Sequence, residues 1–159
     1  MAARLDAVRD GELDLALVRG ALTSAAVTVV RAWSEPLHAV FAREHPAARK
    51  PVVRLHDFAP YGLRLPARDS DPPMYDAIIA ALPMAPPRPP AGDMLNVLFE
   101  VGRDTEGWTL MPAEQLDVSR SERLLHMPLD PPVTVDGHVV TSLATPEPCV
   151  ASYVASFAD

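Results

Sequence analysis

Apolar and polar positions along this chain follow one another in short runs, and turn-forming residues separate the runs. Residues 3–10 place Leu5 and Val8 on one side at a helical spacing, and Gly11 is a natural residue to follow that helix. The next run, residues 13–18, is almost continuously apolar. It predicts a strand buried on both faces, as in a parallel sheet with helices above and below.

Other short apolar runs predict further strands. They fall at 27–33, 36–41, 61–65, 108–111, 124–127 and 138–143. Between them, Asp71 can cap a helix whose first position is Pro72, and Met74, Ile78 and Leu82 then form an apolar stripe along it. Because strands alternate with helices, the pattern predicts an α/β fold.

Two more helices are predicted in the second half of the chain. The first begins at Asp93, turns Leu95, Leu98 and Phe99 inward, and ends at Gly102. The second covers 146–157. The proline-rich stretch at 83–90 predicts an extended surface connection, because each proline ring removes a backbone donor and fixes φ.

Composition narrows the classes of function. A chain of 159 residues is long enough for one domain or two small lobes. The formal net charge of −7 argues against a nucleic-acid-binding surface, which needs basic residues. Cys149 is the single cysteine, so no internal disulfide can form, and no signal peptide or membrane-spanning run is evident. A cytoplasmic protein is the simplest interpretation.

Motifs for catalysis or metal binding are absent from the sequence. There is no Gly-x-Ser-x-Gly elbow, no phosphate-binding glycine loop and no His-x-x-x-His pair. We therefore expect a protein that is not an enzyme and that uses neither a cofactor nor a metal.

Four motifs in order resemble one family. They are Asp-Gly-Glu-Leu-Asp-Leu-Ala-Leu at 10–17, Glu-Pro-Leu at 35–37, Glu-His-Pro-Ala at 44–47, and the stretch from Leu65 to Asp76 that contains Pro-Pro-Met-Tyr-Asp. Their order and spacing resemble the effector-binding domain of LysR-type transcriptional regulators. The resemblance implies a two-lobed fold like type II periplasmic binding proteins, with lobe I at about 1–34 and 120–159 and lobe II at about 35–119. The chain would pass between lobes at about 34–36 and 118–124, leaving a hinged cleft.

The chain also departs from that family pattern. The resemblance begins inside the effector domain, after the first strand, helix and strand, and no DNA-binding head is recognisable in the sequence. The turn between Val101 and Pro112 is longer and more charged than the family's usual glycine turn. We therefore expect an incomplete first lobe, in which residues 13–18 pair with another chain or are covered by a rearranged terminus.

Ligand contacts are expected where strands end near the hinge, because ligands of open α/β sheets bind beyond the carboxyl ends of strands. Arg19 or Arg68 can hold a carboxylate with two hydrogen bonds, or each can be a solvated surface arginine. Trp33 and Trp108 can border an aromatic ligand or fill the core. The full set of candidate ligand-binding residues is Arg19, Gly20, Arg64, Pro66, Arg68, Thr105 and Gly107.

The resemblance implies a regulatory domain that senses a small organic effector, such as a carboxylate or an aromatic compound. We expect it to self-associate, to leave DNA binding to a partner, and to form mixed dimers with a full-length regulator. Two alternatives stay open at this point. One is a solute-binding protein of a transporter, and the other is a fragment that associates but has lost ligand binding.

Overall fold

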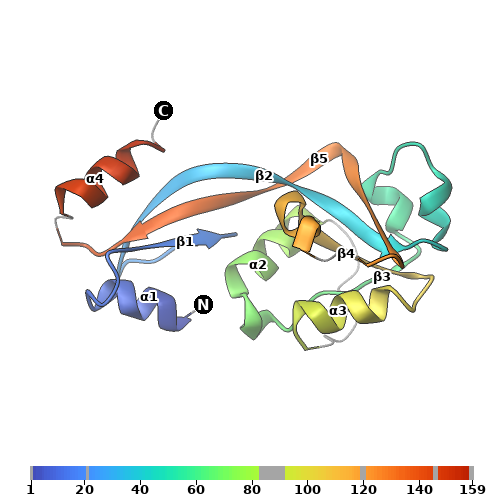
Figure 1. Ribbon diagram of the computed structural model, residues 1–159, viewed down its shortest axis with the longest axis horizontal. Coiled ribbons are helices and arrows are strands. Elements are labelled where there is room, and N and C mark those ends of the chain that lie inside the picture. The colour runs from blue at the N-terminus through green and yellow to red at the C-terminus, as the bar shows by residue number, and fades with distance from the viewer. Residues whose placement is uncertain (1, 21, 83–91, 119–120, 145–146, 158–159) are drawn as a thin grey trace.

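Two long antiparallel strands, β2 (Thr28–Ala42) and β5 (Leu124–Thr141), run the length of the molecule (Figure 1). They pair from Thr28 opposite Thr141 to Ala42 opposite Leu124. This computed structural model describes residues 2–20, 22–82, 92–118, 121–144 and 147–157. The connection expected at 83–90 lies outside the described residues.

Three shorter strands complete one five-stranded sheet of order β1-β5-β2-β4-β3. Strand β1 (Leu15–Arg19) pairs antiparallel with β5, and β4 (Gly107–Pro112) pairs antiparallel with β2. The two-residue β3 (Gly62–Leu63) pairs parallel with β4. The fold is α/β, as the alternation of the sequence predicts.

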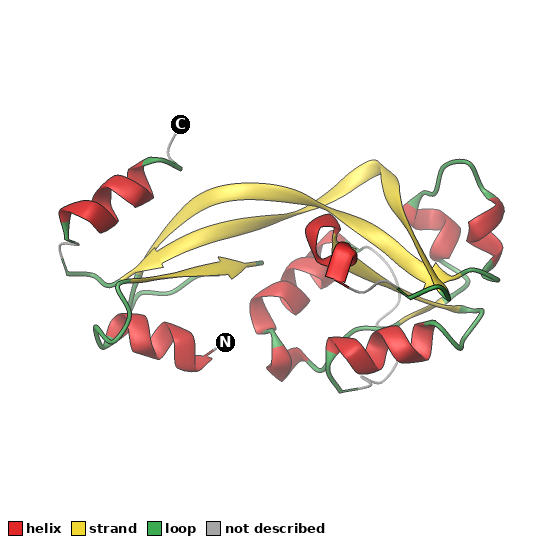
Figure 2. Ribbon diagram, in the orientation of Figure 1, coloured by secondary structure: helices red, strands yellow, loops and turns green. Residues whose placement is uncertain are grey.

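The helices of the described residues form two pairs along this sheet (Figure 2). Helices α1 (Ala2–Arg9) and α4 (Pro148–Ala155) lie at the end that contains β1. Helices α2 (Pro72–Ala81) and α3 (Met94–Val101) lie at the end that contains β3 and β4. Short 3₁₀ turns accompany them at Pro46–Arg49, Leu55–Phe58, Arg68–Ser70 and Ala113–Val118. We call these two regions the β1 end and the β4 end.

The long strands correct one expectation. The sequence predicts separate strands at 27–33 and 36–41, and at 124–127 and 138–143, but each pair is a single continuous strand. The prediction was wrong at the prolines of these segments. A proline has no N–H to donate to a neighbouring strand, so it usually indicates that a strand ends. In this sheet the pairing of β2 with β5 shifts in register near the prolines of β5. Leu37 pairs with Val133, but the next residue, His38, pairs with Pro128.

The same register bears on the predicted passage between lobes. Ser34, Glu35 and Pro36 lie opposite Asp136, Val135 and Thr134. Residues 134–136 of β5 therefore lie opposite the predicted passage at 34–36, and the return predicted at 118–124 stays a prediction.

Strand β1 also differs from its prediction. It joins an antiparallel ladder, and its side chains alternate between buried and open, with Ala16 and Val18 buried and Leu17 43% exposed. A strand covered on both faces was therefore the wrong interpretation of 13–18. Within the described residues β1 is an edge strand, which pairs only with β5.

Helix starts and buried faces follow the sequence more closely. Asp71 caps α2 by accepting from the Met74 amide (3.5 Å), and Asp93 caps α3 by accepting from the Asn96 amide (2.9 Å). Met74, Ile78 and Leu82 are buried as predicted.

The inward face of α3 was predicted only in part. Leu98 is buried, but Leu95 is 73% and Phe99 65% exposed. The buried face of α3 consists of Val97, Leu98 and Val101. These residues follow the helical spacing i, i+1 and i+4, which leaves Leu95 and Phe99 on the outer side of the helix.

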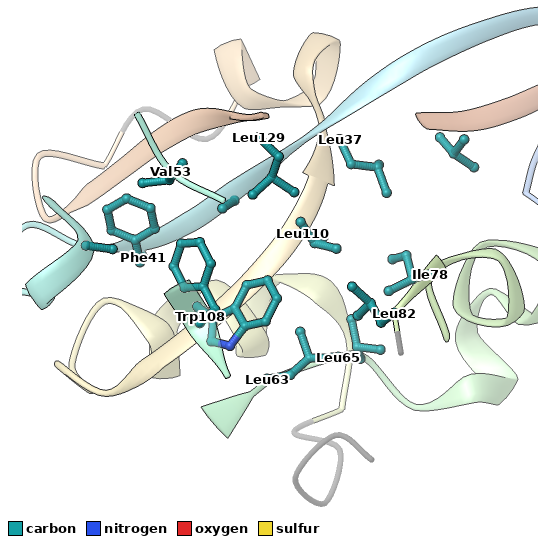
Figure 3. Packing of buried hydrophobic residues seen from close by; sticks show 14 of the residues in the cluster. Leu37, Phe41, Val53, Leu63, Leu65, Ile78, Leu82, Trp108, Leu110 and Leu129 are labelled. Atoms are coloured by element: carbon teal, nitrogen blue, oxygen red, sulfur yellow. The ribbon is translucent and has the colours of Figure 1, made fainter. Parts of the chain in front are cut away.

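Apolar clusters pack the two ends of the sheet, and a third cluster of Val40, Leu98 and Met111 packs α3 against β2 and β4. The largest packs the β4 end around Phe41, Phe58 and Trp108, as Figure 3 shows for part of it. Phe58 and Trp108 stack with ring centroids 4.5 Å apart. The cluster at the β1 end packs α1 against β1 and β5 and consists of Val8, Ala16, Val18, Val27 and Val140. The middle of the sheet, between the clusters, is where the candidate site lies.

Candidate functional site

Three strands direct their carboxyl ends toward the middle of the molecule. Strand β1 ends at Arg19, opposite Gly137 of β5, and β4 ends at Pro112, opposite Leu37 of β2. The two strands run toward each other, because β1 is antiparallel to β5 and β4 is antiparallel to β2. The segment after β3, Leu65-Pro66, leaves the sheet in the same direction as β4. The backbone therefore brings three strand ends to one place.

A cavity of about 300 Å³ opens at this place, mainly on the β4 end. Its wall is largely apolar, with a few polar groups at one side, which is the usual make-up of a small-molecule site. The lining residues are Arg19, Leu65, Pro66, Ala67, Ser70, Asp71, Met74, Tyr75, Ile78, Met94, Pro112 and Gln115.

A wider and more polar cavity of about 750 Å³ adjoins the first. It is lined by Arg4, Leu17, Arg19, Trp33, Ser34, Glu35, Ser70, Asp71, Glu114, Gln115, Tyr153 and Phe157. Four of these residues, Arg19, Ser70, Asp71 and Gln115, also line the smaller cavity. The two cavities are therefore parts of one cleft with walls from both ends of the sheet.

Arg19 lies where the two parts meet. Its Nε donates to Oε1 of Glu35, and its Nη2 lies 3.6 Å from Oε2 of Glu114. Glu35 is buried, with its side chain only 5% exposed, whereas the Glu114 side chain reaches into solvent. The charge of Arg19 is thus already balanced inside the cleft.

Asp71 places a second acid in the same part of the cleft. Burial raises the pKa of its carboxyl, while the hydrogen bond from the Met74 amide at the start of α2 opposes that change. The carboxyl is half-buried and lines both cavities. It serves as a helix cap and as a wall of the cleft together.

Two of the seven sequence-predicted site residues line the cleft. Arg19 stands at its centre and Pro66 in the apolar part. Gly20 follows Arg19 in the chain and has a φ of 96°. A Cβ added at Gly20 would lie 2.2 Å from the Pro73 backbone. Gly20 thus lets the β1 end approach the start of α2 closely.

The other four candidates lie outside both cavities. Arg64 pairs with Glu100 (3.2 Å) and Asp104 (3.0 Å), so it ties the segment after β3 to α3. Arg68 forms a two-pronged bond with Asp76 at the surface, at 2.8 and 2.6 Å. Thr105 and Gly107 lie at the amino end of β4, and Pro112 at the other end reaches the cleft.

Sequence reasoning missed several residues that border the cleft. Gln115 and Glu114 follow the carboxyl end of β4, so the rule about strand ends applied to that side would have found them. Asp71 was predicted only as a cap. Glu35 sits in the middle of a strand, and no signal in the sequence distinguishes it from a surface acid.

The two tryptophans have different places. Trp108 is fully buried in the largest cluster, and Trp33 lines the wider cavity. Trp33 packs directly over Gly137, where an added Cβ would lie 1.9 Å from its Cε2. Trp108 is therefore a core residue, and a ligand contact by Trp33 stays a prediction.

The described part of the chain has neither a metal-binding group nor a membrane-spanning helix. No group of three or more histidine, cysteine, aspartate and glutamate side chains there is arranged to hold a metal ion. None of the described helices has the length and apolar character needed to cross a membrane.

Comparison with known proteins identifies the family. The model of the LysR substrate binding domain matches residues 1–156. This chain belongs to that family, whose domain is a regulatory substrate-binding fold of the periplasmic-binding-protein type and not an enzyme. No curated protein matched the sequence.

Solved structures agree on the fold. The reduced OxyR regulatory domain from Pseudomonas aeruginosa aligns with a TM-score of 0.74 at 17% identity, over 95% of this chain and 74% of that one. The reduced OxyR2 regulatory domain from Vibrio vulnificus gives 0.75 at 17% identity, over 99% and 76%. A full-length BenM mutant gives 0.76 at 19% identity, over 96% and 52%. The chain thus spans about three quarters of the regulatory domains and about half of the full-length regulator.

Proposed function

We propose that this chain is the effector-sensing part of a LysR-type regulator and that it binds a small organic molecule in the cleft around Arg19. The observation that supports this most is the shared wall of the two cavities. Arg19 comes from the β1 end, and Ser70, Asp71 and Gln115 come from the β4 end. A molecule bound there contacts both ends at once, so its binding energy depends on how the ends are held.

In this proposal the β1 end and the β4 end are the two lobes, and β2 and β5 connect them. The net charge of −7 supports a role in which the segment itself does not contact DNA. Any effect on transcription then passes through a DNA-binding region of the same or another chain.

Ligand binding is tested by a thermal-shift screen of small organic molecules. A compound at 100 times its dissociation constant stabilises the folded state by about 2.7 kcal/mol. For a chain of this size that raises Tm by roughly 5–10 °C. Cooperative melting with no shift from any compound contradicts the proposal.

A pair of variants locates the binding site. Gln115→Trp puts a large side chain at the exposed junction of the two cavities and is expected to abolish the shift. Val52→Trp adds the same side chain at another exposed position, outside both cavities, and is expected to preserve the shift. Equal loss in both variants means that the compound binds elsewhere.

Self-association is the second part of the proposal. Strand β1 has one unpaired edge within the described residues, and Leu13 and Leu17 beside it are exposed. An open apolar edge is a template for pairing with another strand, from a second copy or from a full-length regulator in a mixed dimer.

Sedimentation measurements test this edge. Leu17→Lys is expected to weaken association, because a charged edge residue opposes strand pairing. Leu95→Lys, at the more exposed position on α3, is the matched control and is expected to leave association through β1 intact. Co-purification with a full-length regulator tests the mixed dimer, and its failure at high expression counts against that step.

A further inference from the structure

The arginine at the centre of the cleft is poorly placed to receive an anion. Arg19 is engaged by Glu35 through its Nε and faces Glu114 through its Nη2. A ligand carboxylate that took this guanidinium would leave the carboxylate of Glu35 buried and unpaired. Breaking a buried ion pair in this way is strongly unfavourable.

Glu35 also has an unused acceptor. Its Oε1 accepts from Arg19, but Oε2 is buried and has no hydrogen-bond partner. The residue is 4% exposed and lines the wider cavity. A buried acceptor without a donor is costly, so a donor group on a bound molecule would be stabilised here.

Acidic groups outnumber basic groups in the wall of the wider cavity. The wider cavity is lined by the carboxylates of Glu35, Asp71 and Glu114 and by the guanidiniums of Arg4 and Arg19. Arg4 in turn donates to the carbonyl of Leu17 (3.4 Å). The wall of the wider cavity therefore favours positive charge on a ligand.

Aromatic side chains form another part of the same wall. Trp33 lines the wider cavity with Tyr153 and Phe157, whose ring centroids lie 5.1 Å apart in an edge-on arrangement. Aromatic faces attract ammonium groups, and the attraction grows as the cation loses water. Carboxylates and aromatic rings in one cavity are a combination suited to a cation.

We propose that the effector carries a protonated amine on an apolar body, with the ammonium group at Glu35. The inference rests on the proposed function of the cleft and names its ligand class. The apolar part of the cleft, lined by Leu65, Met74 and Ile78, takes the body. The ammonium donates to Oε2 of Glu35, and Arg19 keeps its bond to Oε1.

Matched compounds test the charge preference directly. Each set has one skeleton with three end groups: benzylamine, benzyl alcohol and benzoate, then hexylamine, hexanol and hexanoate. Dissociation constants come from calorimetry and Tm shifts from thermal melting at pH 7. We expect each amine to bind about tenfold more tightly than its alcohol, the range of a hydrogen bond to a charged group, and each acid to bind most weakly.

Glu35→Gln assigns the preference to one side chain. It removes the charge of the acceptor with little change of shape, and the advantage of the amines over the alcohols is expected to fall to about twofold or less, since the ammonium no longer meets an opposite charge. Glu100→Gln removes an acid that pairs with Arg64 outside the cleft, and it is expected to keep the full advantage. If Glu35→Gln does not fold, the ranking of the three end groups on the unaltered chain decides alone.

The outcomes separate the two proposals. Acids that bind more tightly than amines overturn the ligand class and leave the cleft as an effector site. An amine preference that survives in Glu35→Gln overturns the role of that residue. No binding by either set, together with no shift in the wider screen, overturns both proposals.

Discussion

The two ends of the sheet differ in the size of the side chains that they bury. At the β4 end, Phe41, Phe58 and Trp108 are fully buried, and Phe58 stacks on Trp108 and lies tilted against Phe41. At the β1 end the buried cluster contains only valine and alanine, and β1 presents an open edge. Large side chains bury more apolar area, so the β4 end contributes more of the folding free energy. The β1 end depends more on its junction with α2 and on what pairs with its edge.

Removal of the largest buried ring is the strongest way to test this difference. Trp108→Ala is expected to lower the free energy of unfolding by about 3–5 kcal/mol, because it leaves a large cavity beside Phe58. Trp33→Ala is the matched control, since Trp33 is only partly buried and lines the cleft. Urea denaturation measures both variants. Equal losses would show that the two ends are packed alike.

The junction between the ends gives the next effect. In Gly20→Ala the new methyl group would lie 2.2 Å from the Pro73 backbone. Backbone cannot give way as a flexible side chain does, so we expect a further loss of about 1–3 kcal/mol, as for overpacked sites.

Gly11→Ala is the control for this substitution. Gly11 also has positive φ, but nothing lies within 4 Å of its added Cβ. Both variants share the cost of a left-handed backbone, and only Gly20→Ala has the clash. The difference between their urea midpoints therefore measures the junction, and no difference would mean that the two ends do not depend on this contact.

A buried histidine makes the β4 end sensitive to acid. His45 is packed against Phe41, Phe58 and Tyr61, and burial lowers its pKa. The unfolded chain has the ordinary histidine pKa near 6.5, so below about pH 6.5 the unfolded state binds more protons than the folded state. We therefore expect the free energy of unfolding to be highest near pH 7.5 and to decrease as the pH falls toward about 5.5.

His45→Asn tests the source of this dependence. Nδ1 of His45 accepts from the Ala47 amide (3.0 Å), and the asparagine oxygen can take over that bond. The variant is expected to be less stable at pH 7.5, because it loses the ring contacts, but to lose less stability on acidification. His38, whose pKa is also lowered by burial and by His126, accounts for part of the remaining dependence. An unchanged slope in His45→Asn would exclude His45 as the source.

Local signals in the sequence predicted the fold well where one side chain decides the structure. The caps at Asp71 and Asp93 and the stripe of Met74, Ile78 and Leu82 follow from spacing alone. The long strands did not, because their continuity through Pro36 and Pro128 depends on partners about a hundred residues away. Which face of α3 is buried likewise depends on its packing against β4 and β2, which the sequence of the helix alone does not show.

The candidate site was harder to predict than the fold. Arg19 and Pro66 were found from strand ends, but the pairing of Arg19 with Glu35 joins residues on strands whose distance the sequence does not show. Arg68 was also predicted from a strand end. It lies outside both cavities and bonds to Asp76 on α2, so its role in ligand binding stays a prediction.

That contact defines the smallest expected effect. Arg68→Ala removes a two-pronged bond to Asp76 in which both side chains are exposed, so we expect little change in Tm, because surface ion pairs are screened by solvent. Asp76→Ala should match it, and the double variant should lose little more than either single one. Thermal melting with and without a bound compound checks both points. If Arg68→Ala also weakens ligand binding, Arg68 leaves Asp76 on binding and belongs to the site after all. If the ligand shift is unchanged, Arg68 does not take part in binding, and its bond to Asp76 only joins the loop to α2.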